Sequence, residues 1–386
     1  MVSGRIPPQL EPNALARAVA ALRARGAAIA DLTDSNPTRA GIPYPDDLLA
    51  PLANAAALRY EPHPFGMPAA RAAVAADHGR RGVAVDPAHV VLAASTSEAY
   101  SWLFKLLCDA GDRVLVPRPS YPLFEHLTAL EGVGAEPYSL EYHGRWSIDM
   151  ASLRAAPERT RAVLVVSPNN PTGSYLPAEE LAALTQLCRD RRWAVVVDEV
   201  FADYPLDAQA PITDIAARAD VLTFSLAGLS KSVGLPQLKL AWIVAGGPAA
   251  ARDAALASLE LVADSYLSVA TPVQLAAPHL LRAGALVRGA IQQRIRQNLD
   301  ALRAAARGVP ACEVLRAEGG WSAVVRVPAT LGEEALVVGL VEREGILVHP
   351  GYFFDFPREA YLVVSLLPPP AAFADACARL LRVVSG

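Results

Sequence analysis

With 386 residues, 53% of them hydrophobic, and a formal net charge of −4, the chain is long enough for a packed core in two domains. The mild acidity and the absence of a basic stripe exclude nucleic acid as an expected partner. No apolar run reaches the roughly 20 residues that span a bilayer, and the first residues lack the apolar centre of a signal peptide. Four cysteines lack metal-ligand spacing, which is typical of free thiols in a reducing compartment: Cys108, Cys188, Cys312 and Cys377. We therefore expect a cytoplasmic protein with no metal site and no membrane partner.

The chain begins with an arm and a helix rich in alanine and arginine, predicted over residues 13–25. Residues 31–47 contain many turn-forming residues, and because proline disfavours a helix at the residue before it, we expect this segment to be extended. A loop ending at Gly66 and an alanine-rich helix follow.

Short apolar strands alternate with helices in the middle of the chain. Strands are predicted over 90–94, 113–116, 162–166, 194–197, 221–225 and 240–244, and helices over 98–108, 122–131 and 177–191. Continuous β-branched strands bounded by helices indicate a mostly parallel sheet with helices on both faces, an α/β fold in three layers. Such a sheet binds ligands at the carboxyl ends of its strands.

The last third of the chain has a different pattern. Residues 272–308 form long helical material with a bend expected at Pro278. Strands over 321–327 and 362–366 and helices over 333–343 and 371–383 then predict a smaller α+β domain. We expect residues 1–50 to form an N-terminal arm and part of the small domain, 51–285 the large domain, and 286–386 the rest of the small domain.

Polar residues follow several of the predicted strands. Lys231 lies between two apolar runs, where an amine costs several kcal/mol to bury unless its pKa falls or it is bonded to another group. A desolvated amine also attacks carbonyl groups, although a lone lysine in a loop is ordinarily exposed. Asp198 ends a valine-rich strand, Asn170 lies in the turn SPNNPTG, and the hydroxyl residues Ser95, Thr96 and Ser97 connect a strand to a helix.

Together these stretches resemble the pyridoxal phosphate enzymes of fold type I, and within them the class I/II aminotransferases. The motifs that carry the resemblance are NPTG, the downstream D-E-V and S-K-x-x-G-L-P, and it extends from Tyr60 to the end of the chain. It implies a homodimer with shared active sites, bound pyridoxal 5'-phosphate, and a large domain of the fold-type-I kind. It also implies that residues 31–47 cross the mouth of the active site.

The resemblance assigns a role to each residue of the predicted site. Lys231 forms the Schiff base with the cofactor and carries a proton during transamination. Asp198 pairs with the pyridine nitrogen, so that the ring can accept electrons. Asn170 donates to the ring 3′-oxygen, and Tyr121 stacks on the ring. Each residue also has an ordinary structural alternative, as a turn former, a helix cap or a core aromatic.

The phosphate group is expected at the start of the helix that follows residue 94. The backbone N–H groups of Thr96 and Ser97, the hydroxyls of Ser95 and Ser97, and the helix dipole favour a dianion there. The alternative is that Ser95 only caps the helix. By resemblance, Lys239 adds a cation and Tyr60 reaches the phosphate of the neighbouring subunit.

The sequence departs from the family at four positions. Phe201 stands where a tyrosine usually donates to the 3′-oxygen, and Tyr204 is a possible substitute. Lys239 replaces an arginine, so it offers a point charge in place of a bidentate fork. Gly228 stands where a serine is often found. The fourth is Val363, in the last strand.

At Val363 the family usually has an arginine that clamps the α-carboxylate of the substrate with two hydrogen bonds. Either another arginine (Arg39, Arg118 or Arg326) replaces it, or the substrate lacks an ordinary α-carboxylate. We expect common amino acids such as aspartate or alanine to be poor donors. Trp321 and the aromatic residues of 352–356 are candidates for an apolar substrate pocket, although core packing is the alternative for most of them.

We expect an aminotransferase that moves an amino group between an amino donor and a keto acid by ping-pong exchange. The same cofactor also supports elimination or decarboxylation, as in a carbon–sulfur lyase, and local groups decide between these outcomes. A third hypothesis is a non-catalytic regulator that binds pyridoxal phosphate. Lys231, Asp198 and Asn170, and the lack of a DNA-binding segment, argue against this last hypothesis.

Overall fold

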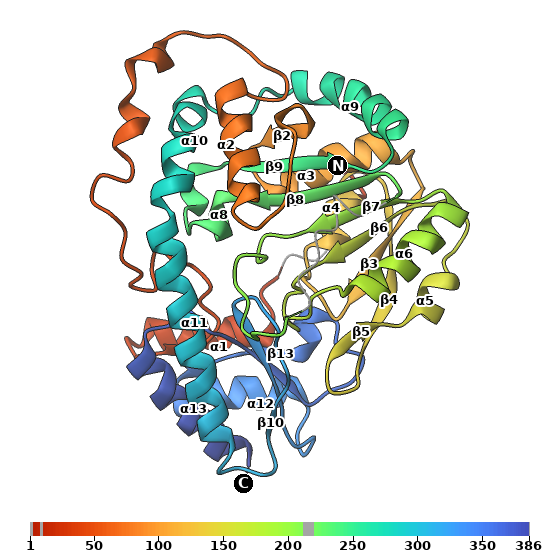
Figure 1. Ribbon diagram of the computed structural model, residues 1–386. Helices are drawn as coiled ribbons and strands as arrows, with labels where there is room; N and C mark the ends of the chain where they lie inside the picture. Colours follow the sequence, from red (N-terminus) through yellow and green to blue (C-terminus); the bar gives the residue numbers. More distant parts are fainter. Residues whose placement is uncertain (1–2, 8–10, 211–219, 386) are drawn as a thin grey trace.

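An eight-stranded sheet with helices on both faces forms the larger part of the molecule (Figure 1). The computed structural model describes residues 3–7, 11–210 and 220–385. Residues 1–2 and 8–10 of the expected arm, 211–219 of the expected large domain, and residue 386 lie outside the described residues. In spatial order the strands are β2 (Val90–Ala93), β9 (Ala241–Gly246), β8 (Thr223–Gly228), β7 (Ala194–Asp198), β6 (Thr160–Val166), β3 (Arg113–Arg118), β4 (Gly134–Tyr142) and β5 (Trp146–Ile148).

The central strands are parallel, which confirms the predicted sheet. β8, β7, β6, β3 and β4 all run in one direction, whereas β9 is antiparallel to both β2 and β8. The sequence pattern did not predict β4 or β5, which pair antiparallel at one edge. Residues 137–141 of β4 alternate between exposed and buried, and most of β5 is only partly buried, because this edge is covered less than the centre. The apolar runs that marked the other strands are therefore absent.

Alternate residues of the strands pack against opposite helix layers. Leu164 and Val166 belong to the same core cluster as residues of α3 (Thr96–Leu107) and α9 (Ala249–Asp264). Val163 and Val165 pack on the other side with α6 (Ala178–Arg191). Since successive side chains of a strand point to opposite faces, continuous valine and leucine runs produce a sheet that is buried on both sides.

Further helices complete the two layers. α4 (Phe124–Leu130) joins the α3 side and α5 (Met150–Arg154) the α6 side. α2 (Pro68–Gly79) and α10 (Thr271–Ala283) pack beside the β2 and β9 end of the sheet. The short helices between them are η1 (Ala50–Ala53), η2 (Ala55–Leu58), η3 (Pro87–His89), α8 (Leu229–Ser232) and η4 (Pro236–Leu238).

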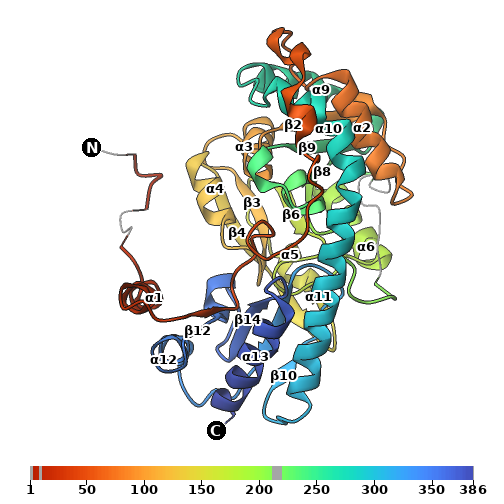
Figure 2. The same ribbon diagram turned by 90° about the vertical axis from the view of Figure 1, so that its left-hand side faces the viewer.

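A smaller antiparallel sheet lies beside the large one (Figure 2). Its strands, in order, are β10 (Glu313–Val314), β11 (Ser322–Arg326), β14 (Tyr361–Ser365) and β13 (His349–Pro350). The N-terminal segment joins this unit, because β1 (Ala30–Asp31) pairs with β12 (Ile346–Leu347). Its helices are α1 (Ala14–Ala24), α12 (Glu333–Gly339), the π-helical turn η5 (Leu340–Glu344), η6 (Gly351–Phe354) and α13 (Pro370–Val384).

The long helical stretch between the two sheets is interrupted at Gly284, whereas the sequence predicted a bend at Pro278. α10 continues past Pro278, and α11 (Ala285–Ala306) begins after Gly284. A Cβ at Gly284 would lie 2.4 Å from Cγ1 of Val233, so the close approach to the α8 segment requires glycine there. The predicted domain boundaries remain an interpretation.

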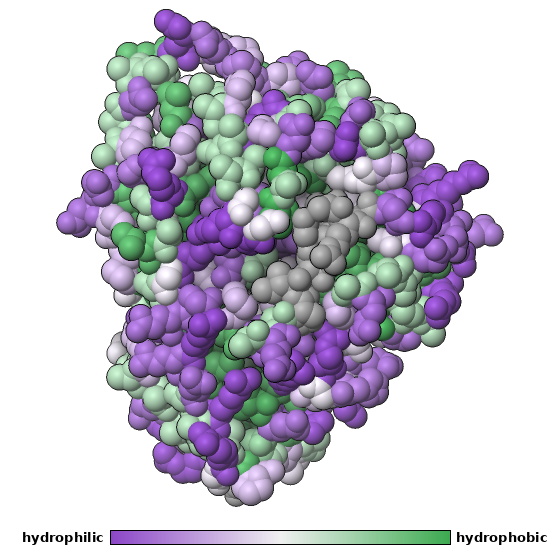
Figure 3. Space-filling model, viewed as in Figure 1, coloured by the Kyte–Doolittle hydropathy of each residue, from purple (hydrophilic) through white to green (hydrophobic). Residues whose placement is uncertain are grey.

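The surface and the cysteines add two observations. The face seen in Figure 3 is mostly hydrophilic, with apolar residues in small separate areas. The four cysteines are free thiols. Among the helices of the described part of the chain, none has the length and apolar character needed to cross a bilayer.

Candidate active site

A cavity of about 460 Å³ lies where the carboxyl ends of the large sheet face the small sheet. Eight of the residues predicted to form the site line it together: Ser95, Thr96, Ser97, Tyr121, Asn170, Asp198, Lys231 and Trp321. Asp198 is the last residue of β7, and the hydroxyl residues directly follow β2. Because parallel strands end at the same edge, residues far apart in the chain meet there.

Asp198 is buried at the floor of this cavity. Its Oδ2 accepts a hydrogen bond from the Tyr100 hydroxyl at 3.1 Å, and its Oδ1 accepts one from the backbone N–H of Val200, also at 3.1 Å. Burial raises the pKa of Asp198 to about 6, and these two hydrogen bonds oppose the rise. Both contacts fix the orientation of the carboxyl group.

Tyr100 is a site residue that the sequence analysis missed. It lies on α3, is buried, and stacks on Phe104 with ring centroids 6.0 Å apart. In the sequence it is one aromatic residue among several in an apolar helix, so nothing distinguishes it from a core residue. Only the packing of α3 over β7 brings its hydroxyl to Asp198.

Lys231 is partly buried and lines the same cavity, in the single helical turn α8. Burial lowers its pKa to about 8, against the opposing influence of the Asp198 charge. The Nζ lies 4.9 Å from the ring centroid of Trp321 and 5.6 Å from that of Phe201. The two aromatic rings thus provide cation–π contacts to the Lys231 amine. Among the residues that the structure describes, no carboxylate forms an ion pair with this amine within 4.0 Å.

Tyr204 does not replace the hydroxyl that Phe201 lacks. Its side chain is fully buried, and its hydroxyl donates to the backbone carbonyl of Lys231 at 2.5 Å. Its ring packs edge-on against Trp321, with centroids 5.1 Å apart. Tyr204 therefore stabilises the backbone of the turn that carries Lys231.

The two neighbouring asparagines have different surroundings. The Asn169 side chain is buried, donates to the Pro119 carbonyl at 3.0 Å and to Thr172 Oγ1 at 2.8 Å, and accepts from the Ser120 hydroxyl. Asn170 lines the cavity instead, where its Oδ1 accepts from the Ser322 hydroxyl at 3.3 Å. Asn169 therefore braces the turn, and Asn170 remains available at the cavity wall.

The first turn of α3 borders the cavity through Thr96 and Ser97. Ser95 caps the helix, since its Oγ accepts from the Glu98 N–H at 3.1 Å. Glu98 in turn accepts from the Ala94 N–H at 2.6 Å, which completes a reciprocal cap close to the capping box. The partial positive charge of this helix end is directed at the cavity and favours an anion there.

Three predicted site residues do not line the cavity. Lys239 is exposed, with a left-handed backbone (φ 51°), immediately before β9. Tyr60 is 75% exposed and borders a different, smaller pocket. Arg39 has a side chain that is 68% exposed and is paired with Asp34 at 3.1 Å.

The other arginines considered as carboxylate ligands are also engaged elsewhere. Arg118 pairs with Glu125 at 2.6 Å and with Asp355 at 3.3 Å. Arg326 pairs with Glu313. Val363 itself contributes to the cavity wall.

Several cavity residues had no assigned role in the sequence analysis: Thr33, Ser35, Ser322, His349 and Ser365. Thr33 and Ser35 lie in the extended segment expected at the mouth of the site. The others come from β11, β13 and β14, and only the pairing of these strands places them together.

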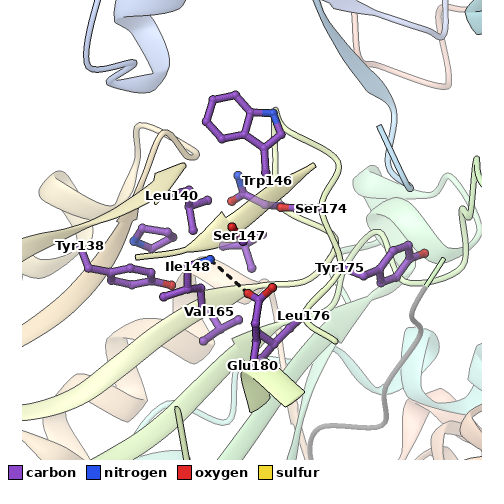
Figure 4. A pocket seen from close by; sticks show the side chains of 13 residues that line it. Tyr138, Leu140, Trp146, Ser147, Ile148, Val165, Ser174, Tyr175, Leu176 and Glu180 are labelled. Atoms are coloured by element: carbon purple, nitrogen blue, oxygen red, sulfur yellow. Dashed lines mark hydrogen bonds between the residues drawn. The ribbon is translucent and has the colours of Figure 1, made fainter. Parts of the chain in front are cut away.

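A second cavity, of about 20 Å³, lies beside β4, β5 and α6 (Figure 4). Glu180 accepts a hydrogen bond from the Ile148 N–H at 3.1 Å there, and it also pairs with Arg145 at 2.6 Å. This volume holds about one water molecule. It is too small for a cofactor or substrate.

Comparison with known proteins gives consistent matches over nearly the whole chain. The family model "Aminotransferase class I and II" matches residues 52–380. An alanine aminotransferase of Mycobacterium tuberculosis is 28% identical over 371 residues, covering 94% of this chain and 86% of that protein. The glutamate-pyruvate aminotransferase AlaA of Escherichia coli is 24% identical over 375 residues, covering 95% and 92%. The structure of an alanine aminotransferase from Pyrococcus furiosus superposes with a TM-score of 0.88 at 21% identity, covering 99% of this chain and 100% of that chain.

Proposed function

The chain belongs to the class I and II aminotransferases, and from this premise we propose that it transfers amino groups with pyridoxal 5'-phosphate bound between Asp198 and Lys231. One observation carries the proposal: a buried carboxyl and a partly buried amine, each with a pKa moved toward its neutral form by desolvation, line one cavity without forming an ion pair within 4.0 Å. Two such groups are costly to bury apart unless each has a partner. A cationic ring nitrogen is a partner for the carboxylate, and an aldehyde is a partner for the amine.

The remaining residues of the cavity fit the other parts of this cofactor. The first turn of α3, with Ser95, Thr96 and Ser97, suits a phosphate dianion. Asn170 is positioned to bond a ring substituent, and Tyr121, which is 46% exposed in the cavity, offers an aromatic face. Lys239 does not line the cavity and would act on the phosphate only through its charge.

When bound, pyridoxal phosphate supplies an aldehyde that exchanges amino groups and a ring that accepts an electron pair from the substrate carbon. Lys231 contributes an amine whose lowered pKa, about 8, leaves part of it neutral near pH 7, so it can accept a proton and return it. Asp198, at the floor of the cavity, would pair with the positively charged ring nitrogen of the cofactor. Trp321 and Phe201 place aromatic rings beside the amine, which favours its charged form.

Family membership favours transamination over elimination, decarboxylation or a purely regulatory role. The two curated relatives compared above are named for alanine and for glutamate and pyruvate, and a third, from Pseudomonas aeruginosa, is named for arginine and pyruvate. We propose that this protein likewise alternates between an amino donor and a keto acid at one site.

We further propose a cytoplasmic homodimer in which Tyr60 completes the site of the neighbouring subunit. Tyr60 is 75% exposed and Leu58 is 92% exposed. Both lie in or next to the η1–η2 segment, which forms an outer loop along the edge of the molecule in Figure 1. An apolar side chain this exposed is well suited to cover by another subunit. The four free thiols are in keeping with a reducing compartment.

The test compares Lys231→Ala with Lys105→Ala, a lysine outside the cavity that pairs with Glu131. After addition of pyridoxal phosphate and borohydride, wild type and Lys105→Ala should gain the mass of the cofactor at residue 231, and Lys231→Ala should not. The amine-dependent loss of visible absorbance should slow by about 10²–10⁴-fold in Lys231→Ala alone. A Lys231→Ala protein that reacts at the wild-type rate contradicts the proposal.

A further inference from the structure

One face of the small sheet forms the wall of the cavity opposite Asp198. Ser322 lies opposite Ser365 in the β11–β14 pair, and Val363 lies opposite His349 in the β13–β14 pair. Cross-strand partners share a face of the sheet, and residues two apart in a strand do so as well. These four residues, which we call the substrate wall, all line the cavity.

The substrate wall carries no charge. Of the described residues that line the cavity, Asp198 and Lys231 alone belong to the acidic and basic types, and neither lies on the small sheet. His349 is neutral, since burial lowers its pKa below the ordinary value of 6.5 despite the nearby Asp31. Arg326 lies four residues along β11 from Ser322, at about 13 Å for an extended strand, with Glu313 as its partner.

The two serines of the substrate wall already have hydrogen-bond partners, whereas His349 has none among the described residues. The Ser365 hydroxyl donates to the Asp34 carbonyl at 2.8 Å and accepts from the Leu367 N–H at 3.3 Å. The Ser322 hydroxyl donates to Asn170 at 3.3 Å. Neither ring nitrogen of His349 has a hydrogen-bond partner within the part of the chain that the structure describes, and of the two only Nδ1 is buried.

Aromatic neighbours hold the imidazole in place. The rings of Phe353 and Phe354 pack against it, with centroid distances of 5.8 and 5.6 Å. Both phenylalanines also line the cavity. The buried Nδ1 atom is closed to a ligand, so a molecule in the cavity can bond to the imidazole only at Nε2, and a hydrogen bond there offsets part of the cost of holding a polar ring among phenylalanines.

We propose that the preferred amino donor is a primary amino alcohol on an apolar chain, and that His349 is the residue that binds its hydroxyl group. The inference rests on the proposed function. A carboxylate placed against Val363 and the two phenylalanines would be desolvated without a cation. A hydroxyl can both donate to and accept from a neutral imidazole, so either tautomer serves.

The reaction keeps the balance of a transamination. The C–N bond of the amino alcohol breaks and its carbon becomes the carbonyl of a hydroxy ketone, while the keto acid gains the amino group and a hydrogen at its former carbonyl carbon. Because the keto acid meets the same uncharged wall, we expect it to have a high KM. The first half-reaction, measured without acceptor, isolates the donor.

The experiment uses donors that differ at one group. L-alaninol, L-alanine and 2-aminopropane carry a hydroxymethyl group, a carboxylate and a methyl group at the same position, and each is mixed with the holoenzyme while the visible absorbance of the bound cofactor is followed. Wild type should react with alaninol at least about tenfold faster than with alanine. His349→Phe should slow the reaction with alaninol by about tenfold, because one hydrogen bond to its hydroxyl is lost, and should leave the rate with 2-aminopropane unchanged.

Two further variants keep the test decisive. His349→Gln retains a donor and an acceptor and should recover part of the alaninol rate, which a purely structural role of His349 would not produce. His143→Phe changes an exposed histidine outside the cavity and should match wild type with all three donors. Melting temperatures establish that the variants are folded.

The outcomes separate this inference from the proposed function. If alanine reacts faster than alaninol, the inference is overturned while the proposed function stands, and loss of that preference in Arg39→Ala would identify Arg39 as the carboxylate ligand. Equal effects of His349→Phe on alaninol and 2-aminopropane also overturn it. A protein that takes up no cofactor overturns the proposed function, and this inference with it.

Discussion

Asp198 and Lys231 are ionisable side chains that burial moves toward their neutral forms. The pKa of the carboxyl rises to about 6 and that of the amine falls to about 8, and for both groups burial is the largest cause. Near neutral pH both therefore carry charge at a cost to the stability of the empty protein. A ligand that bonds to both groups removes that cost.

At this scale, Asp198→Asn should change how the stability of the apoprotein depends on pH. The folded-state pKa of Asp198, about 6, lies above its ordinary value of 3.8, so the stability this group contributes below pH 4 is lost as the pH rises toward 6. The loss is up to about 3 kcal/mol. Urea unfolding between pH 4 and 7 should show the wild type weakening relative to Asp198→Asn over this range. A difference that does not vary with pH would contradict the assignment.

Lys231 has the opposite pH dependence. Its folded-state pKa of about 8 lies below the ordinary 10.5, so the folded apoprotein gains stability as the pH rises from 8 toward 10.5. The wild-type apoprotein is thus expected to be destabilised by these two groups mainly between pH 6 and 8. Saturation with pyridoxal phosphate should raise its melting temperature most in that interval.

Gly173, in the turn that presents Asn170, offers a second prediction for a single residue. Its φ is +71°, and a Cβ there would lie 2.6 Å from the Gly319 carbonyl oxygen. Gly144 also has a positive φ, +86°, but open space around it. Gly144→Ala should lower the free energy of unfolding by about 1 kcal/mol, and Gly173→Ala by about 2–4 kcal/mol, since strain and a backbone clash add. Equal losses in urea unfolding would show that the clash is relieved.

Among the elements, α3 combines two tasks, because its capped first turn borders the cavity and its second turn supplies Tyr100 to Asp198. Its N-terminus and the end of β7 are adjacent because β2 and β7 run in the same direction, with only the reversed β9 and the parallel β8 between them. One helix thus orients both an anion site and the floor carboxylate.

Ser95→Ala should separate the capping role of this helix end from its binding role. Loss of the cap should lower the free energy of unfolding by about 1 kcal/mol. It should also raise the Kd for pyridoxal phosphate, because a hydroxyl at the anion site is removed. Asn13→Ala removes the cap of α1, far from the cavity, and should lower stability by a similar amount without affecting the Kd. Fluorescence titration and urea unfolding measure the two quantities. An unchanged Kd in Ser95→Ala would leave Ser95 as a cap only.

At the scale of the whole molecule, the site is built from both sheets and from the N-terminal segment. Thr33 and Ser35 reach the cavity because β1 pairs with β12 in the smaller unit. The long helix α11 runs alongside both parts of the molecule in Figure 1. Since the two halves of the cavity wall come from different sheets, small shifts between the sheets would alter the fit of a substrate.

The proposed dimer predicts an effect of Tyr60 that the isolated chain does not explain. Tyr60→Ala should raise the Kd for pyridoxal phosphate although Tyr60 does not line the cavity of its own chain. Tyr266, a half-exposed tyrosine that does not line the cavity, provides the control, and Tyr266→Ala should leave the Kd unchanged. Mixing Tyr60→Ala with Lys231→Ala subunits at limiting cofactor should restore up to about a quarter of wild-type activity, because each mixed dimer contains one intact site. Sedimentation as a monomer would refute the shared site.

Much of this organisation was accessible from local sequence. Runs such as Val195 to Val197, bounded by turn residues, indicate strands that are buried on both faces, and the turn residues mark the ends of those strands. This reasoning predicted the parallel sheet, and the resemblance carried by its motifs indicated the family and the site residues, of which eight line the cavity. It missed β4 and β5 because an edge pair needs neither an apolar run nor a covered face.

By itself, the sequence determined the order of elements and the residue types at strand ends, because hydrophobic periodicity and turn chemistry act over a few neighbouring residues. Only the tertiary structure decided which of those residues share a cavity. In the folded chain the Tyr100 hydroxyl bonds to Asp198, the Tyr204 hydroxyl bonds to the backbone of Lys231, and His349 lies opposite Val363. Such contacts join segments that are distant along the chain, and they depend on strand register and helix packing, which no local pattern encodes.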